Sequence, residues 1–128
     1  MSKLPMLAAA ALAPLIAPPA QAQTTASPAQ YVVTLSSYAY SPKPIRLTAG
    51  QPVTMVFVNR SGSGHDFTAR EFFAASKITG GAAPGGEIEL RGGETKSLTL
   101  IPARGTYRVH CGHFMHSAFG MTDQIIVQ

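Results

Sequence analysis

A cluster of metal-binding residue types near the C-terminus is the feature of this 128-residue sequence that could do chemistry. Cys111 is the only cysteine, and three of the four histidines lie beside it within seven residues of one another: His110, His113 and His116. Met121 follows the last of these by five residues. A thiolate and a thioether bind Cu(I), and imidazole binds both oxidation states, so these donors suit copper. His65 lies well upstream, and we expect it to reach the cluster from another loop.

Other interpretations of these residues remain open. A lone cysteine is most often a buried apolar filler, and Met121 taken alone is most often core packing. Zinc suits the same Cys and His atoms, although closed zinc sites use more Cys or His ligands and rarely a thioether. In an exported protein a single Cys111 cannot form a disulfide within the chain, which favours a chemical role for it.

The N-terminus has the pattern of a secretory signal. Lys3 precedes an apolar stretch over residues 4–17, and Ala20-Gln21-Ala22 offers the small residues that signal peptidase accepts. We therefore assign residues 1–22 to a signal peptide cleaved after Ala22, with Gln23 as the first mature residue and a periplasmic or otherwise exported location. A membrane anchor is the alternative, but prolines interrupt a stretch that is shorter than the roughly 20 apolar residues of a span.

The mature part has 106 residues, enough for one domain and its core, with no room for a second catalytic domain. We assign residues 23–30 to a flexible lead and residues 31–128 to the domain, and we expect a monomer. Nine Lys and Arg against six Asp and Glu give a net charge of +3, which weakly favours an acidic partner. These basic residues are scattered singly, so we expect no nucleic-acid partner.

Short apolar stretches separated by Gly and Pro turns predict an all-β fold. We expect eight strands, over residues 31–36, 45–48, 53–59, 66–69, 87–90, 96–101, 106–111 and 124–127. Alternation in the stretch 106–111 places Cys111 on the inner face and His110 on the outer face. Strands at this spacing predict a two-sheet antiparallel Greek-key β-sandwich.

One segment does not fit the strand pattern. Residues 71–77 predict two helical turns, and a Gly-rich stretch over residues 80–86 follows them. We expect a short helical flap that crosses between the sheets, with Phe72 and Phe73 covering the edge of the core. An exposed aromatic partner site is the alternative, although paired phenylalanines are more often buried.

The sequence resembles the cupredoxins, the superfamily of blue-copper proteins that includes plastocyanin and azurin, over nearly the whole mature chain. One motif is His65-Asp66-Phe67, which follows a predicted strand. The other begins at Gly105 and continues through Cys111, His116 and Met121. Its Cys-to-His interval is similar to that of azurins, and its His-to-Met interval is similar to that of plastocyanins.

The resemblance implies one copper per chain. Its trigonal ligands would be His65, Cys111 and His116, and Met121 would be the weak axial ligand. Because Cys111 ends a strand and one short loop then carries the next two ligands, the sandwich would fix the geometry of the metal. His113 lies only two residues beyond Cys111 and would need a very tight chelate, so we expect it near the copper but outside the ligand set.

Asp66 departs from the family pattern, because better-known members commonly have Asn after this histidine. An ionised Asp only accepts hydrogen bonds. It would accept them from backbone N–H groups or hydroxyls beside Cys111 and add negative charge near the copper, which stabilises Cu(II). A buried, protonated Asp66 is the alternative.

The resemblance implies a one-electron carrier that cycles Cu(II) and Cu(I) between redox protein partners, and not an enzyme. The sequence shows no hydrolytic or oxidase machinery; multicopper oxidases and copper nitrite reductases share this fold but need further copper ligands and domains. The alternative function is a periplasmic copper-binding or copper-resistance protein that stores or delivers copper. In that case His110, His113 and Met115 would form a surface route for the metal.

Overall fold

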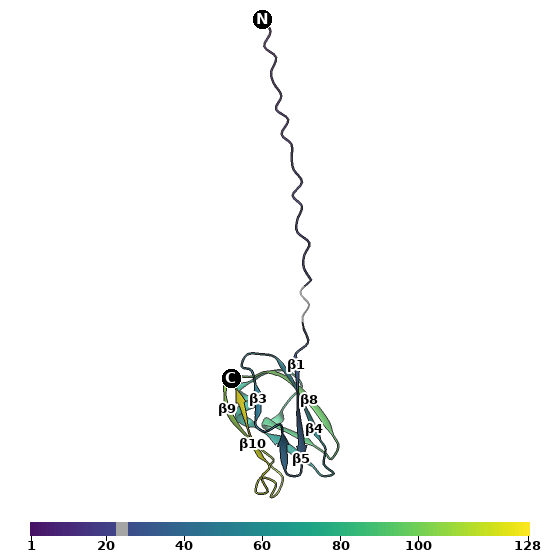
Figure 1. Cartoon of the computed structure of the whole chain (residues 1–128), viewed down its shortest axis with the longest axis vertical. Coiled ribbons are helices and arrows are strands. Elements are labelled where there is room, and N and C mark those ends of the chain that lie inside the picture. The colour runs from purple at the N-terminus through teal and green to yellow at the C-terminus, as the bar shows by residue number, and fades with distance from the viewer. Residues whose placement is uncertain (23–25) are drawn as a thin grey trace.

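Two five-stranded sheets pack face to face in the computed structural model, which describes residues 1–22 and 26–128 (Figure 1). The first sheet has the strand order β2-β1-β4-β8-β6 and the second has the order β3-β10-β9-β5-β7. The strands are β1 (Ala29–Ser36), β2 (Ala39–Ser41), β3 (Ile45–Leu47), β4 (Val53–Asn59), β5 (His65–Thr68), β6 (Lys77–Gly80), β7 (Glu87–Leu90), β8 (Thr95–Ile101), β9 (Gly105–His110) and β10 (Thr122–Val127). The predicted β-sandwich is confirmed.

Alternating side chains form the core between the sheets, as the pleat of a strand requires. In β4 every second residue is buried, from Val53 to Asn59. Phe57 of β4 meets Phe67 of β5 across the sandwich, with ring centroids 4.8 Å apart. The two sheets therefore share one apolar interior, and Cys111 and Met121 belong to it.

The expectation of antiparallel pairing throughout is wrong for two strand pairs. β1 pairs with β4 in parallel, and β3 pairs with β10 in parallel. After β1 the chain forms β2, crosses to β3 in the second sheet and then returns to β4 in the first. Such a crossover lets a strand return beside an earlier one in the same direction, which a tight hairpin cannot do.

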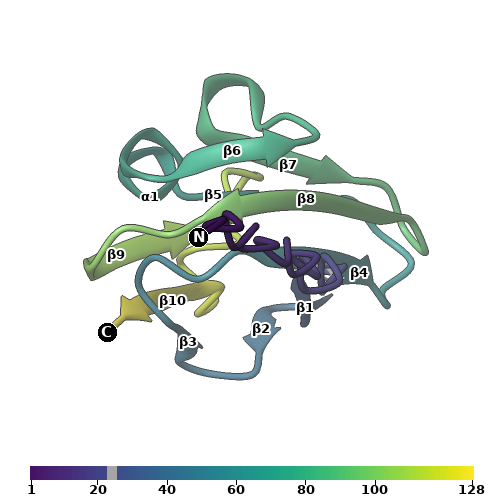
Figure 2. The ribbon, with the colours of Figure 1, turned by 90° about the horizontal axis from the view of Figure 1, so that it is seen from above.

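The predicted helical flap is present and shorter than expected. Helix α1 (Arg70–Ala75) follows β5 of the second sheet, and β6 then pairs with β8 of the first sheet. Phe72 and Phe73 are buried, so the alternative of an exposed aromatic partner site is wrong. Figure 2 shows α1 beside β6 at the edge of the sandwich. A single 3-10 turn, η1 (Pro84–Gly86), precedes β7.

The N-terminal segment carries no regular structure in residues 1–22, whose side chains are all exposed. The predicted first mature residue, Gln23, lies outside the described residues. The flexible lead that we assigned to residues 23–30 ends earlier than expected, because β1 already begins at Ala29. Within the described residues, no helix has the length and apolar character needed to cross a membrane.

Candidate metal centre

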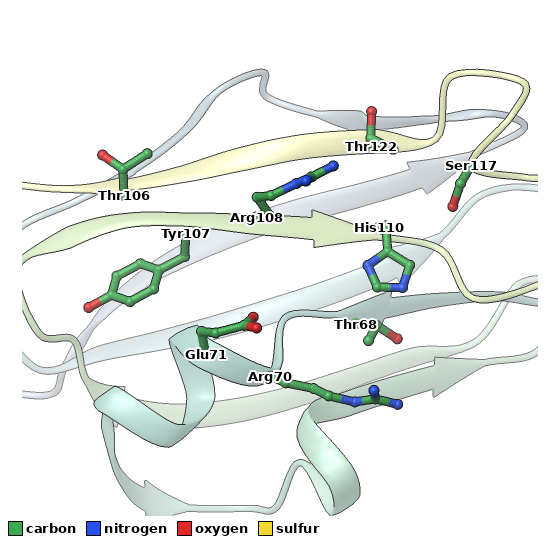
Figure 3. A pocket seen from close by; sticks show the side chains of 9 residues that line it. All are labelled: Thr68, Arg70, Glu71, Thr106, Tyr107, Arg108, His110, Ser117 and Thr122. Atoms are coloured by element: carbon green, nitrogen blue, oxygen red, sulfur yellow. The ribbon is translucent and has the colours of Figure 1, made fainter.

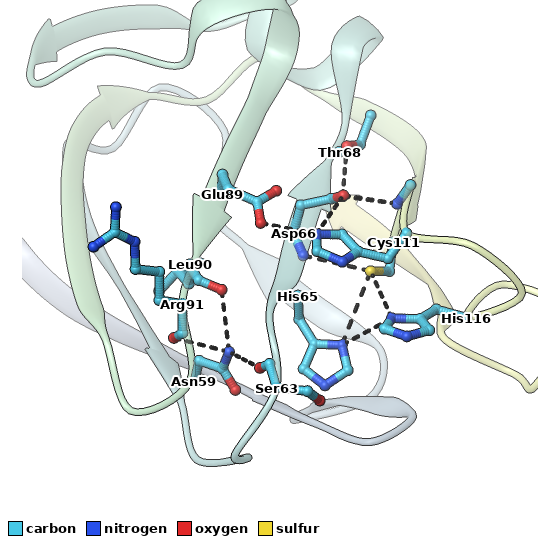
Figure 4. A network of polar contacts seen from close by, with 12 residues as sticks. Asn59, Ser63, His65, Asp66, Thr68, Glu89, Leu90, Arg91, Cys111 and His116 are labelled. Atoms are coloured by element: carbon cyan, nitrogen blue, oxygen red, sulfur yellow. Dashed lines mark hydrogen bonds and ion pairs between the residues drawn. The ribbon is translucent and has the colours of Figure 1, made fainter.

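Three donor atoms from two distant parts of the sequence converge at one end of the sandwich (Figure 4). The Nδ1 atoms of His65 and His116 lie 3.1 Å apart. Cys111 Sγ lies 3.4 Å from His116 Nδ1 and 4.0 Å from His65 Nδ1. The structure therefore brings together three of the four residues that the sequence predicted as ligands, each with a nitrogen or sulfur atom directed at the others.

Strand β5 positions His65, which was expected on a loop and instead is the first residue of the strand. The side chain is fully buried. Its Nε2 atom forms a 2.9 Å hydrogen bond with Ser37 Oγ, so the ring is held by one nitrogen while Nδ1 faces the other donors. Burial lowers the pKa of His65, and the neighbouring His116 and His113 lower it further. The ring is thus kept neutral, the form that binds a metal.

The thiol of Cys111 lies just beyond the end of β9 and is buried, as the strand alternation predicted. The backbone N–H of Asp66 donates a hydrogen bond to Sγ over 3.4 Å. Burial raises the pKa of Cys111, so without a nearby cation the sulfur stays protonated. A bound metal ion would supply the positive charge that stabilises the thiolate.

The loop between β9 and β10 carries His116 and Met121 back past the thiol. Backbone hydrogen bonds fold it tightly: Met121 N donates to His116 O over 3.0 Å, and Cys111 N donates to Met121 O over 3.1 Å. Ser117 Oγ donates to Cys111 O over 2.7 Å. Met121 is fully buried directly before β10. The hydrogen bonds hold the backbone of Cys111, His116 and Met121 close together.

Asp66 ties the two ligand segments together. Its carboxylate accepts a bifurcated hydrogen bond from the backbone N–H of Gly112, 2.9 Å to each oxygen, and one of 2.7 Å from Thr68 Oγ1. These partners are a backbone amide and a hydroxyl beside Cys111, the two kinds of hydrogen-bond donor expected from the sequence. The close approach depends on Gly112, because a Cβ there would lie 3.1 Å from Asp66 Oδ2.

Two site residues were missed by sequence analysis, Ser37 and Tyr38. They form the turn between β1 and β2, where Ser37 holds His65 and the Tyr38 ring lies 4.9 Å from that of His116. The Phe119 ring packs against the Tyr38 ring at 5.1 Å. The sequence signal for this segment is an aromatic residue in an otherwise polar turn. Tyr38 thus links the β1–β2 turn to the loop that carries His116.

Apolar side chains surround this end of the molecule on its outside. Phe114 is 90% exposed and Phe119 is 59% exposed, and Met115 and Tyr38 are also exposed. His116 is only half-buried between them. Exposed apolar side chains that gather at one end of a protein are typical of interaction surfaces.

His110 lies away from the three donor atoms. It is exposed, as the alternation predicted, and it faces an open cleft of about 560 Å³ on the outer side of β9. Figure 3 shows His110 and Arg108 on this side of the strand, with Glu71 of α1 across from them. His110 therefore lies on the outer face of β9, in a cleft that Ser117 of the ligand loop also lines.

The donor set fits copper. Two imidazoles and a thiolate, with the thioether residue Met121 bonded to the backbone of Cys111 and His116, match the ligands of a mononuclear copper that changes between Cu(II) and Cu(I). The neutral ring of His65 and the buried sulfur of Cys111 are ready to bind once the thiol loses its proton. The site accommodates one such ion per chain.

Comparison with known proteins points the same way. The model of a family described as "Cupredoxin-like domain" matches residues 6–127. No curated protein matches the chain significantly.

Several solved structures are similar to the chain. Auracyanin B is 24% identical, with a TM-score of 0.57, over 80% of this chain and 91% of that one. Auracyanin A, a "blue" copper protein from Chloroflexus aurantiacus, is 20% identical with a TM-score of 0.59, over 80% of this chain and 100% of that one. A multicopper oxidase from Campylobacter jejuni is 14% identical with a TM-score of 0.61, over 82% of this chain and 31% of the oxidase. At these identities the likeness shows a shared fold.

Proposed function

The chain belongs to the cupredoxin-like family, and from that premise we propose that it is an exported one-electron carrier with a single type 1 copper. In this proposal His65, Cys111 and His116 are the trigonal ligands and Met121 is the axial ligand. The observation that carries it is the convergence of two Nδ1 atoms and one Sγ atom within 4.0 Å in a largely buried site.

Rigidity of the site supports electron transfer. Copper bound there supplies one-electron redox chemistry. The residues of the chain hold the ligands in place: Ser37 bonds one imidazole, Asp66 bonds the loop after Cys111, and the sheet fixes the thiol. Because these contacts tie the ligand residues to both sheets, few atoms need to move when the charge of the site changes. Small rearrangement is what fast electron exchange requires.

The half-buried ring of His116 is the proposed point of electron exchange. Unlike the buried His65 and Cys111 it is partly exposed, and it lies on the same loop as the exposed apolar side chains Phe114, Met115 and Phe119. A redox protein that docks on these side chains would approach within one imidazole of the metal. The similarity to auracyanins, one of which is described as a "blue" copper protein, supports a carrier over an enzyme.

Export is proposed from the sequence pattern of residues 1–22, with cleavage after Ala22 and a periplasmic location. The net charge of +3 in the mature part supports an acidic redox partner. The mature chain is proposed to act as a monomer with residues 31–128 as its copper domain.

Copper retention separates a carrier from a protein that stores or delivers copper. The mature, copper-loaded protein is cycled between its oxidised and reduced forms in the presence of a Cu(I) chelator, and the remaining copper is measured. We expect a reversible voltammetric wave and unchanged copper content after many cycles, because the site is preformed. Loss of Cu(I) to the chelator on first reduction would overturn the carrier and favour the delivery function.

A further inference from the structure

A second group of metal-binding side chains lies beside the copper site and shares none of its donor atoms. It consists of Asp66 on β5, Glu89 on β7 and His113 on the ligand loop. The strand register places Asp66 directly opposite Glu89. Figure 4 shows these two side chains next to each other. His113 Nε2 lies 2.8 Å from Glu89 Oε1 and 3.8 Å from Asp66 Oδ2.

The backbone leaves space for this arrangement at Gly64. A Cβ at that position would lie 3.0 Å from His113 Cε1 and 3.7 Å from Glu89 Oε1. Most side chains at position 64 would therefore push the imidazole away from the carboxylates. His113 is also held from its other side, where its ring stacks on that of His116 at 5.3 Å with an angle of 18°.

The group carries uncompensated negative charge. In the part of the chain that the structure describes, neither carboxylate forms an ion pair with a lysine or arginine. Glu87 is affected by this charge. Burial raises the pKa of Glu87, and the negative charges of Asp66 and Glu89 raise it further. A cation among the three side chains would neutralise this charge.

We propose that Asp66, Glu89 and His113 form a second site that binds a divalent first-row cation such as Zn²⁺. One imidazole nitrogen and two carboxylate oxygens, all within 4.8 Å of one another, are a donor set that zinc accepts, with water completing its coordination. The cation replaces the proton between His113 Nε2 and Glu89, and that proton passes to the solvent. Glu89 is exposed and His113 is partly exposed, so the ion reaches the site from outside.

The second site is coupled to the first through Asp66. The carboxylate of Asp66 bonds Gly112, and its backbone N–H donates to Cys111 Sγ. A dication on that carboxylate places positive charge near the copper and favours Cu(I). Because coupling is reciprocal, Cu(I) in the first site must in turn strengthen zinc binding in the second. This coupling rests on the proposed copper function, whereas the zinc site itself does not.

Calorimetric titration of the copper-loaded protein with Zn²⁺ tests the site. We expect one zinc per chain while the visible absorption of the copper site is retained. Glu89→Gln should weaken binding at least about tenfold, the loss typical of disturbing a metal site. Glu71→Gln is the matched control, because Glu71 is also exposed and lies on α1 outside the group.

Two results would overturn the second site: no zinc taken up beyond the copper, or zinc binding that Glu89→Gln leaves unchanged. The same titration on Cys111→Ser separates the two proposals. Zinc binding that still depends on Glu89 in that variant supports the second site even if the chain proves to bind no copper through Cys111.

Discussion

Two histidines on the loop between β9 and β10 point their ring nitrogens at different partners. His116 directs Nδ1 at Cys111 Sγ, 3.4 Å away, whereas His113 directs Nε2 at Glu89. The two rings lie only three residues apart and stack on each other. Spacing along the loop led us to expect this division, because a metal shared by Cys111 and His113 would need a very tight chelate.

Histidine replacements test the division directly. We expect His116→Ala to abolish the visible thiolate-to-copper absorption and alter the EPR spectrum of the Cu(II) form, because a strong ligand is lost. His113→Ala should leave both spectra largely intact. The assignment of the ligand loop is wrong if the two variants behave in the opposite way.

We expect Asp66 to influence the reduction potential of a copper ion bound at this site. An ionised carboxylate that accepts hydrogen bonds from Gly112 and Thr68 adds negative charge close to Cys111 and stabilises Cu(II) over Cu(I). Replacement by the neutral isostere in Asp66→Asn should therefore raise the reduction potential, measured by voltammetry in the absence of added zinc. Thr68→Val, which removes one hydrogen bond but no charge, is the control with a smaller expected shift. An unchanged or lower potential in Asp66→Asn would mean that this carboxyl is uncharged.

Loops at the copper end of the sandwich owe their shape to close backbone packing. Gly92, between β7 and β8, lies against the loop that leads into His65, and a Cβ there would come within 2.7 Å of the Gly62 carbonyl carbon. Gly62 itself has open space around its own Cβ position. The two glycines therefore form a natural pair for comparison.

Gly92→Ala should destabilise the protein by about 1–3 kcal/mol, the usual cost of forcing extra atoms into a packed region. Gly62→Ala should change the free energy of unfolding by much less. Chemical denaturation of the copper-free mature chain measures both. Equal stability of the two variants would show that the loops move apart freely and that this contact does not hold the His65 segment.

Elements with strong alternation were predicted well, and short ones were not. Strands such as β4 and β8 follow the period of two that a half-buried strand requires. The missed strands β2 and β6 have three and four residues, and β6 has no buried side chain to produce a pattern. Parallel pairing of β1 with β4 also escaped prediction, because pairing depends on the path of the chain through both sheets.

The site was predicted to the extent that its chemistry lies in rare residue types. Cys111 and the nearby histidines are conspicuous in the sequence, whereas Ser37 and Glu89 are common residues in ordinary surroundings. Their roles come from the β1–β2 turn and from the register of β5 with β7. Such contacts arise only when distant strands pair.

For the whole molecule, the sandwich is a rigid support with its chemistry at one end. The apolar core joins both sheets, and the ligand segments project from β5, β9 and β10 of the second sheet while the β1–β2 turn of the first sheet covers them. Exposed apolar side chains lie at the same end, where the rings of His113 and His116 are partly exposed. The concentration of these residues at one end suits a small protein that binds its partners through a single surface.

Binding of one copper per chain through Cys111 is tested by the visible and EPR spectra of the copper-loaded mature protein. We expect one copper per chain and an intense thiolate-to-Cu(II) absorption that disappears in Cys111→Ser. A protein that takes up zinc but no copper, or one whose colour survives Cys111→Ser, would contradict it.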